Sequence, residues 1–240
     1  MKLALNKNLN NLNQFWQSLD ANKKNDVFSH QSWPNKQWKI DFTLPNASLN
    51  WLLPVNKSYS TLTDVSDHEV SKLGLVVKNQ LVAMSLSLKT DDGTHIKVGE
   101  KHSKIVKLNI KEDATRWAVA CGQAFGYEID ASVIQGLLKD SNASVFSYMV
   151  DDQIAGTAIS YKSGDTLGIH QLGTVSSFRK MGIAASLMQH LLSQANSEGA
   201  HFVTLQASKA GLHLYERLGF QALGKITSLV RSDRSFKLSK

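Results

Sequence analysis

The sequence predicts an α/β or α+β protein built on a mixed sheet, and two observations support this prediction. Apolar residues recur at helical spacing in some segments, notably in residues 182–197, where Leu187 and Leu191 share one stripe. Short apolar runs bounded by turn residues alternate with such segments, as in residues 144–150. The predicted order after residue 105 is β-α-α-β-β-β-α-β-α-β, which is typical of helices packed on a mixed sheet.

Composition and charge narrow the class of protein. The chain has 240 residues, of which 42% are apolar and 20% are charged, and no apolar run is long enough to span a membrane. The first residues are too broken by asparagine for a signal peptide, and the single Cys121 excludes an internal disulfide, so we expect a cytoplasmic protein. The net charge of +7 is spread out, so we expect a polyphosphate cofactor rather than nucleic acid or membrane.

The sequence divides into two predicted regions, residues 1–105 and 106–240. The first has breaks at its three prolines and no motif that carries chemistry. Its Lys78-Asn79 pair predicts a tight hairpin. Its predicted elements are a helix at 9–19 and strands at 49–55, 72–77, 81–88 and 95–98. Three roles stay open for this region: a degenerate copy of the second region's fold, a substrate cap or an assembly surface.

The second region has the stronger periodicity. Asp130 is placed to cap one of its helices, and Gly219 to end another. Its predicted strands are 105–110, 144–150, 154–161, 165–174, 201–206, 220–230 and 235–238, and its predicted helices are 113–125, 131–139, 182–197 and 208–218.

One loop in this region predicts an anion-binding site. It contains Arg179, Gly182 and Ala184, follows a predicted strand and opens a predicted helix. Glycine permits an unusual backbone angle, and the small Ala184 leaves room for a ligand. The free N–H groups of the helix terminus suit an anion, and we expect a pyrophosphate.

With this loop and a later motif, the sequence resembles the GNAT superfamily of N-acetyltransferases. The loop matches the family pattern Arg/Gln-x-x-Gly-x-Gly/Ala, and Tyr215 followed by Gly219 and Phe220 matches a second family landmark. The resemblance covers about residues 107–230. It implies the GNAT fold and acetyl-CoA as cosubstrate, but it leaves the acceptor open.

The resemblance also implies roles for individual residues. The strand backbone at Leu172, Gly173 and Thr174 would pair with pantetheine, and Tyr215 would protonate the leaving thiolate. Ser208 stands where many members have an asparagine that touches the cofactor. The loop residues implied to bind the pyrophosphate are Arg179, Lys180, Met181, Gly182, Ile183, Ala184 and Ala185.

A base must accept the proton of the attacking amine, and His170 is the first candidate. It lies nine residues before Arg179, an offset at which some members of the family have a histidine. A packed strand histidine is the alternative. Glu128 and Asp130 are fallback bases, although Asp130 is more simply a helix cap.

Other chemistries have weaker signals. Cys121 shares an apolar stripe with Trp117 and is expected in the core, which favours direct transfer over an acyl-enzyme. Residues 219–226 approach a phosphate-loop pattern, but Ile226 replaces the magnesium ligand. The eight histidines form no zinc motif, so we expect no metal.

These patterns predict an acetyl-CoA-dependent N-acetyltransferase that acts directly on a primary amine of a small molecule or peptide. A catalytically inactive CoA-binding regulatory module is the alternative, and a nucleic-acid-associated protein is a third hypothesis. Residues 1–105 lack a second Arg-x-x-Gly-x-Ala loop, so one cofactor is expected per chain. The oligomeric state stays open.

Overall fold

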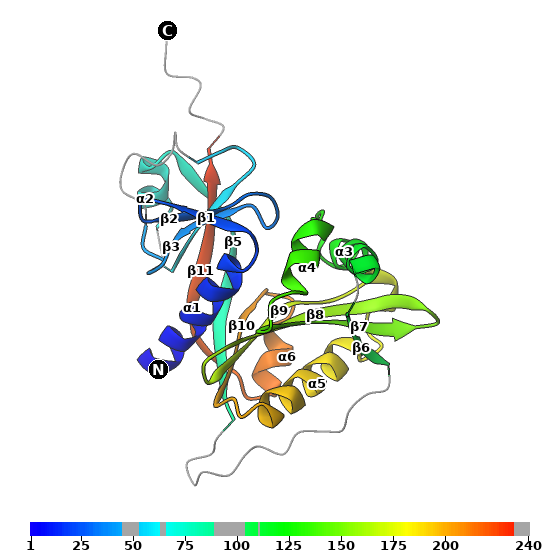
Figure 1. The fold of residues 1–240 in the computed structure, drawn as a ribbon. Coiled ribbons are helices and arrows are strands. Elements are labelled where there is room, and N and C mark those ends of the chain that lie inside the picture. Colours follow the sequence, from blue (N-terminus) through cyan, green and yellow to red (C-terminus); the bar gives the residue numbers. More distant parts are fainter. Residues whose placement is uncertain (45–52, 63–65, 89–103, 110, 233–240) are drawn as a thin grey trace.

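The protein, seen in a computed structural model, is built on one large mixed sheet flanked by helices (Figure 1), which confirms the predicted fold class. The structure describes residues 1–44, 53–62, 66–88, 104–109 and 111–232. The predicted strands at 95–98 and 235–238, and most of that at 49–55, lie outside these residues.

The elements follow one another in this order: α1 (Lys2–Gln17), β1 (Ala21–Lys24), β2 (Val27–His30), β3 (Lys36–Lys39), β4 (Ser58–Leu62), α2 (Asp67–Lys72), β5 (Leu75–Ser87), β6 (Ile105–Lys107), α3 (Lys111–Phe125), α4 (Ala131–Leu137), β7 (Ala143–Val150), β8 (Gln153–Ser163), β9 (Thr166–Thr174), a 3₁₀ turn (Ser176–Phe178), α5 (Ile183–Ser197), β10 (Phe202–Ala207), α6 (Leu212–Arg217) and β11 (Gln221–Arg231).

The eleven strands of the described residues lie in the order β1-β2-β3-β4-β11-β5-β10-β9-β8-β7-β6. Among the described strands, only the pairs β3–β4 and β9–β10 are parallel. Strand β5, from the first predicted region, lies between β10 and β11 of the second, and Figure 1 shows β5 and β11 side by side along their length. The division at residue 105 remains a prediction about folding units, and the sheet is continuous across it.

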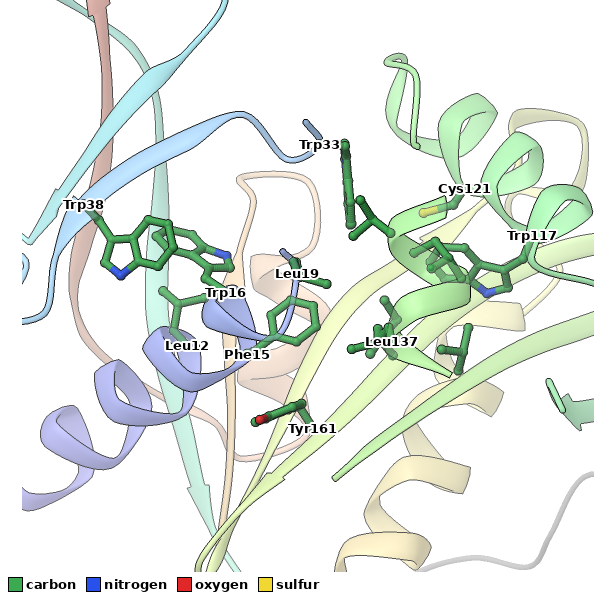
Figure 2. Packing of buried hydrophobic residues seen from close by; sticks show 14 of the residues in the cluster. Leu12, Phe15, Trp16, Leu19, Trp33, Trp38, Trp117, Cys121, Leu137 and Tyr161 are labelled. Atoms are coloured by element: carbon green, nitrogen blue, oxygen red, sulfur yellow. The ribbon is translucent and has the colours of Figure 1, made fainter. Parts of the chain in front are cut away.

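The helices cover opposite faces of the sheet. Side chains of β8 alternate between them: Ile159 packs in a cluster with α1, α3 and α4, and Ala158 packs in a second cluster with α5 and α6. Figure 2 shows the first cluster, which extends from Trp38 and Trp16 to Trp117 and Cys121. Aromatic residues of the first region therefore share a core with the helices of the second.

Three predicted elements were wrong in detail: a hairpin, the helix at 208–218 and the start of the first helix. The hairpin at Lys78-Asn79 does not exist, because β5 is one 13-residue strand paired with β11 on both sides of this point. Asn79 pairs with Ser228 and Val77 with Leu229, so Lys78 is the extra residue of a β-bulge. The predicted helix at 208–218 is shorter, because residues 208–211 form a turn before α6.

Helix α1 begins at Lys2, well before the predicted start at residue 9. Its asparagines do not break it, because three of them are buried and hydrogen bonded to other elements. Asn8 Nδ2 donates to the carbonyls of Met84 and Leu205 (2.8 and 3.0 Å), and Trp38 Nε1 donates to Asn13 Oδ1 (2.9 Å). These contacts fix α1 across the sheet.

Candidate active site

The parallel strands β9 and β10 separate near the middle of the sheet. Their pairing ends at Ile169 and Leu205, although β9 continues to Thr174, and its other edge stays paired with β8. Among the described strands none pairs with the β10-facing edge of residues 170–174. The backbone groups of Leu172, Gly173 and Thr174 on this edge are therefore available to an extended ligand, because β9 has separated from β10 here.

A β-bulge marks the point of separation. Gln171 has a φ of 48°, and two residues of β9 lie opposite one of β8 here. Thr157 Oγ1 donates to the Gln171 carbonyl (3.1 Å). The side-chain Oε1 of Gln171 accepts hydrogen bonds from the Tyr127 hydroxyl (3.1 Å) and the Cys121 thiol (3.6 Å). The bulge is thus held by three groups from β8 and from α3 and the loop after it.

The predicted phosphate loop joins β9 to α5. Gly182 caps α5 with a φ of 76°, and Lys180 has a φ of 66°. No side chain caps this helix, so its first N–H groups remain available for an anion. A Cβ on Gly182 would meet no protein atom within 4 Å, so the glycine is required by its backbone angle rather than by protein packing.

The predicted loop residues differ in where their side chains lie. Met181 is exposed, Ala184 and Ala185 are half-buried, and Ile183 is buried in the core, so Ile183 offers only its backbone amide to a ligand. Arg179 donates from Nε to the Thr174 carbonyl (3.4 Å) and from Nη2 to the Ala124 carbonyl (3.2 Å). Its side chain therefore ties the loop to β9 and to the end of α3.

Tyr215 is buried on α6, with its ring against Gly211 and edge-on to Phe220 (5.9 Å between centroids). Burial raises its pKa to about 12, so the phenol keeps its proton at neutral pH. Ser208 lies nearby in the turn before α6, where its carbonyl accepts from the amides of Gly211 and Leu212 (3.0 and 3.1 Å). Tyr215 and Ser208 both line the cavity described below.

His170 is buried and held by α1. Its Nε2 lies 3.1 Å from Asn11 Oδ1, and its ring stacks on Phe15 at 3.8 Å between centroids. Burial lowers its pKa to about 3, so the imidazole is neutral at physiological pH. This geometry favours the packed strand histidine over the general base, because so weak a base gains little by accepting the proton of an amine.

The two fallback carboxylates lie in different settings. Asp130 caps α4, and its Oδ1 accepts from the Ser132 amide and hydroxyl (2.9 and 2.6 Å), which hold its pKa below the usual range. Glu128 lines the cavity next to Tyr127 and contributes the only carboxylate among the described lining residues.

The cavity has a volume of about 540 Å³ and joins the two faces of the sheet. Phe15 and Trp16 line it from α1, and Tyr215 lines it from α6, which covers the opposite face. A cavity lined from both faces must pass through the sheet, and β9 and β10 are separated here. It is therefore suited to a reaction between a ligand lying along β9 and a second ligand from the α1 side.

Sequence reasoning missed the part of the first region that lines this cavity. Trp33 and Lys36 lie on either side of the break at Pro34, and Lys78 occupies the bulge on β5. In the sequence, Trp33 and Lys36 were recognisable only as neighbours of a predicted break, and Lys78 only as part of a predicted hairpin. Neither feature indicates a binding site. The first predicted region therefore supplies part of the wall of this cavity.

Within the described ranges, no group of three or more histidine, cysteine, aspartate or glutamate side chains is arranged to hold a metal ion. No described helix is long and apolar enough to cross a membrane. Cys121 is buried, and burial raises its pKa to about 12, which fits a core thiol.

Comparison with known proteins adds a family and a fold. Residues 103–228 match the acetyltransferase (GNAT) domain family. Among solved structures, a GNAT-family protein from Novosphingobium aromaticivorans is 15% identical, with a TM-score of 0.66 over 93% of this chain and 96% of that one. A GCN5-related N-acetyltransferase from Kribbella flavida is 16% identical, with a TM-score of 0.61 over 90% and 91%. No curated protein matches the chain in sequence.

Proposed function

Because the chain belongs to the GNAT family of acetyltransferases, we propose that it transfers the acetyl group of acetyl-CoA directly to a primary amine. The observation that carries this proposal is the gap between β9 and β10. It lies between the uncapped N-terminus of α5 and a cavity that opens on the opposite face of the sheet. Pantetheine would lie along Leu172–Thr174, and the pyrophosphate at the amides of residues 180–185.

The reaction requires a proton acceptor and a proton donor. We assign the role of proton acceptor to Glu128, which would act directly or through water, because it is the carboxylate that lines the cavity among the described residues. The amine nitrogen attacks the thioester carbonyl carbon, and backbone N–H groups near Leu172 stabilise the oxyanion. When the carbon–sulfur bond breaks, the Tyr215 hydroxyl gives its proton to the thiolate of CoA, and the tyrosinate recovers, by way of solvent, the proton that Glu128 accepted from the amine.

His170 takes a positioning role in this scheme. It connects β9 to Asn11 and Phe15 of α1, and so orients the wall of the acceptor cavity beside the bulge. The buried thiol of Cys121 supports transfer without an acyl-enzyme and suits the reducing cytoplasm as the compartment. The acceptor is a small molecule or the amine of a peptide.

The test combines binding with turnover. Calorimetric titration should give one acetyl-CoA site per chain, and a panel of primary amines should include acceptors that release CoA and gain an acetyl group, as identified by mass. Two CoA sites per chain would contradict the assignment to one loop. Binding without transfer to any amine would point to a regulatory module instead.

A further inference from the structure

The cavity carries opposite charges at opposite ends. Glu128 follows α3 near the gap between β9 and β10, whereas Lys36 and Lys78 line the end formed by β3, β11 and β5. An acceptor that binds in this cavity therefore meets a carboxylate near the reacting end and two cations at the far end.

Lys36 is a cation without a counterion in the described part of the chain. Its Nζ donates to the neutral Ser228 Oγ at 3.2 Å and lies 5.4 Å from the centre of the Trp16 ring. Burial and the nearby charge of Lys78 lower its pKa to about 8, so it is still mostly protonated at neutral pH. A partly buried ammonium held by a hydroxyl and a ring is stabilised further when an anion binds it.

Lys78 reaches this end of the cavity through a specific irregularity of β5. It is the unpaired residue of the bulge between Val77 and Asn79, and bulges redirect the side chain that they insert. Its Nζ makes no ion pair within the described residues. Two neighbouring ammonium groups repel each other, and this repulsion is relieved by a shared anion.

We infer that the acceptor is a primary amine that also carries an anionic group, a carboxylate or a phosphate, bound by Lys36 and Lys78. This inference rests on the proposed function, whose reacting centre it shares. Lys36 begins β3, but its Nζ donates to Ser228 on β11, and strands β5 and β10 lie between β11 and β9. Three strand spacings of about 4.8 Å separate β11 from β9, and two separate β5, which carries Lys78, from β9, which gives on the order of 10–14 Å. The amine and the anion are therefore well separated in the acceptor, unlike those of an α-amino acid.

The experiment uses the full chain and three matched probe series. Straight-chain ω-amino carboxylates of increasing length are compared with their methylamides, and aminoalkyl phosphates with the corresponding amino alcohols. The third series consists of alkanoates and alkyl phosphates without an amine, whose binding is measured by calorimetry. The two anionic series distinguish a carboxylate acceptor from a phosphorylated one.

We expect the anionic amines of intermediate or greater length to have a KM about 10- to 100-fold below that of their neutral partners. Lys36→Met should remove this advantage with little change in kcat or in acetyl-CoA affinity, and Lys36→Arg should retain most of it. Lys24→Met is the matched control, because Lys24 is an exposed lysine of the same part of the sheet and lies outside the cavity. It should leave all three series unchanged.

The outcomes separate this inference from the proposed function. If amines are acetylated but neutral and anionic partners react equally well in the parent protein, the inference is wrong and the transferase assignment stands. If no amine is acetylated, the third series still decides: binding of alkanoates or alkyl phosphates that Lys36→Met abolishes supports the anion site. Absence of such binding in the parent protein, with acetyl-CoA bound normally, overturns it.

Discussion

Nε2 of His170 lies 3.1 Å from Oδ1 of Asn11, and this contact joins the first helix of the chain to the strand at which the parallel pair separates. Asn11 also donates from Nδ2 to the Tyr161 carbonyl and to the Ser163 hydroxyl (2.9 and 2.7 Å). The same side chain thus connects α1 to both β8 and β9. Residues of α1 line the cavity because this contact and those of Asn8 hold α1 on the sheet.

Gly168 makes this contact possible. A Cβ at this position would lie 1.7 Å from Asn11 Oδ1 and 2.6 Å from His170 Nε2, so Gly168→Ala must displace one of them. We expect a loss of about 1–3 kcal/mol in the free energy of unfolding, measured with urea, because buried polar groups lose their partners. The double variant Gly168→Ala, Asn11→Ala should lose less free energy of unfolding than the sum of the losses in the two single variants. Full additivity would show that the clash is relieved elsewhere.

The buried His170 makes stability depend on pH. Its pKa is about 3 in the folded protein and near 6.5 in the unfolded chain, so the unfolded chain binds more protons between these values. The contribution of His170 to the free energy of unfolding is fully present above about pH 6.5 and is lost as the pH is lowered towards 3. Between pH 7 and pH 5 the loss should be about 2 kcal/mol, by urea unfolding.

His170→Gln isolates the contribution of His170 to the pH dependence of stability. The glutamine amide can still donate to Asn11 Oδ1, but a glutamine does not titrate. His30 has a pKa lowered to about 3 by burial as well, and its contribution remains in both proteins. An equal pH dependence in the parent and the variant would contradict the neutral, packed imidazole. In turnover per folded molecule, the variant should keep most of the parent rate, since the proton acceptor is assigned to Glu128.

Glu128→Gln should lower kcat by about 10²-fold or more, with acetyl-CoA affinity unchanged. The reason is that a glutamine cannot accept the proton of the amine. Asp130→Asn serves as the comparison, since Asp130 is bonded to the start of α4 and should change stability more than rate. Unchanged kinetics in Glu128→Gln would exclude it as the base.

Gly182→Ala should weaken acetyl-CoA binding by about tenfold, because a φ of 76° costs a residue with a Cβ on the order of 1–2 kcal/mol. Gly136→Ala is the matched control: it lies in α4, has no positive φ, and its added Cβ would meet nothing within 4 Å. That variant should bind acetyl-CoA normally and be slightly more stable. Equal affinity in a folded Gly182→Ala would remove the loop from the cofactor site.

The second half of the fold was predictable because its signals are local. The stripe of Leu187 and Leu191, the cap at Asp130 and the glycine at 182 each act within a few residues, and each occurs as predicted. The strand β9 was also predicted nearly to its ends. Local periodicity and capping decide such elements before any tertiary contact forms.

The cavity was not predictable in the same way, because long-range contacts decide it. Asparagine disfavours helix interiors, so the start of α1 was predicted too late, but the helix is stabilised by bonds from Asn8 and Asn11 to distant strands. Lys78-Asn79 has the composition of a turn, and only its pairing with β11 makes it a bulge. The environment of His170 follows from Phe15 and Asn11, more than 150 residues earlier in the chain.

Tyr215→Phe gives the most direct test of the central assignment, that this protein acetylates amines with Tyr215 as the proton donor. The hydroxyl makes no hydrogen bond to the described residues, so the variant should fold with unchanged stability and acetyl-CoA affinity. With a responsive amine from the panel, single-turnover measurement should show formation of the acetylated amine and free CoA in equal amounts, slowed by about 10²-fold in the variant. A variant that acetylates the same amine at the parent rate per folded molecule would contradict the assignment.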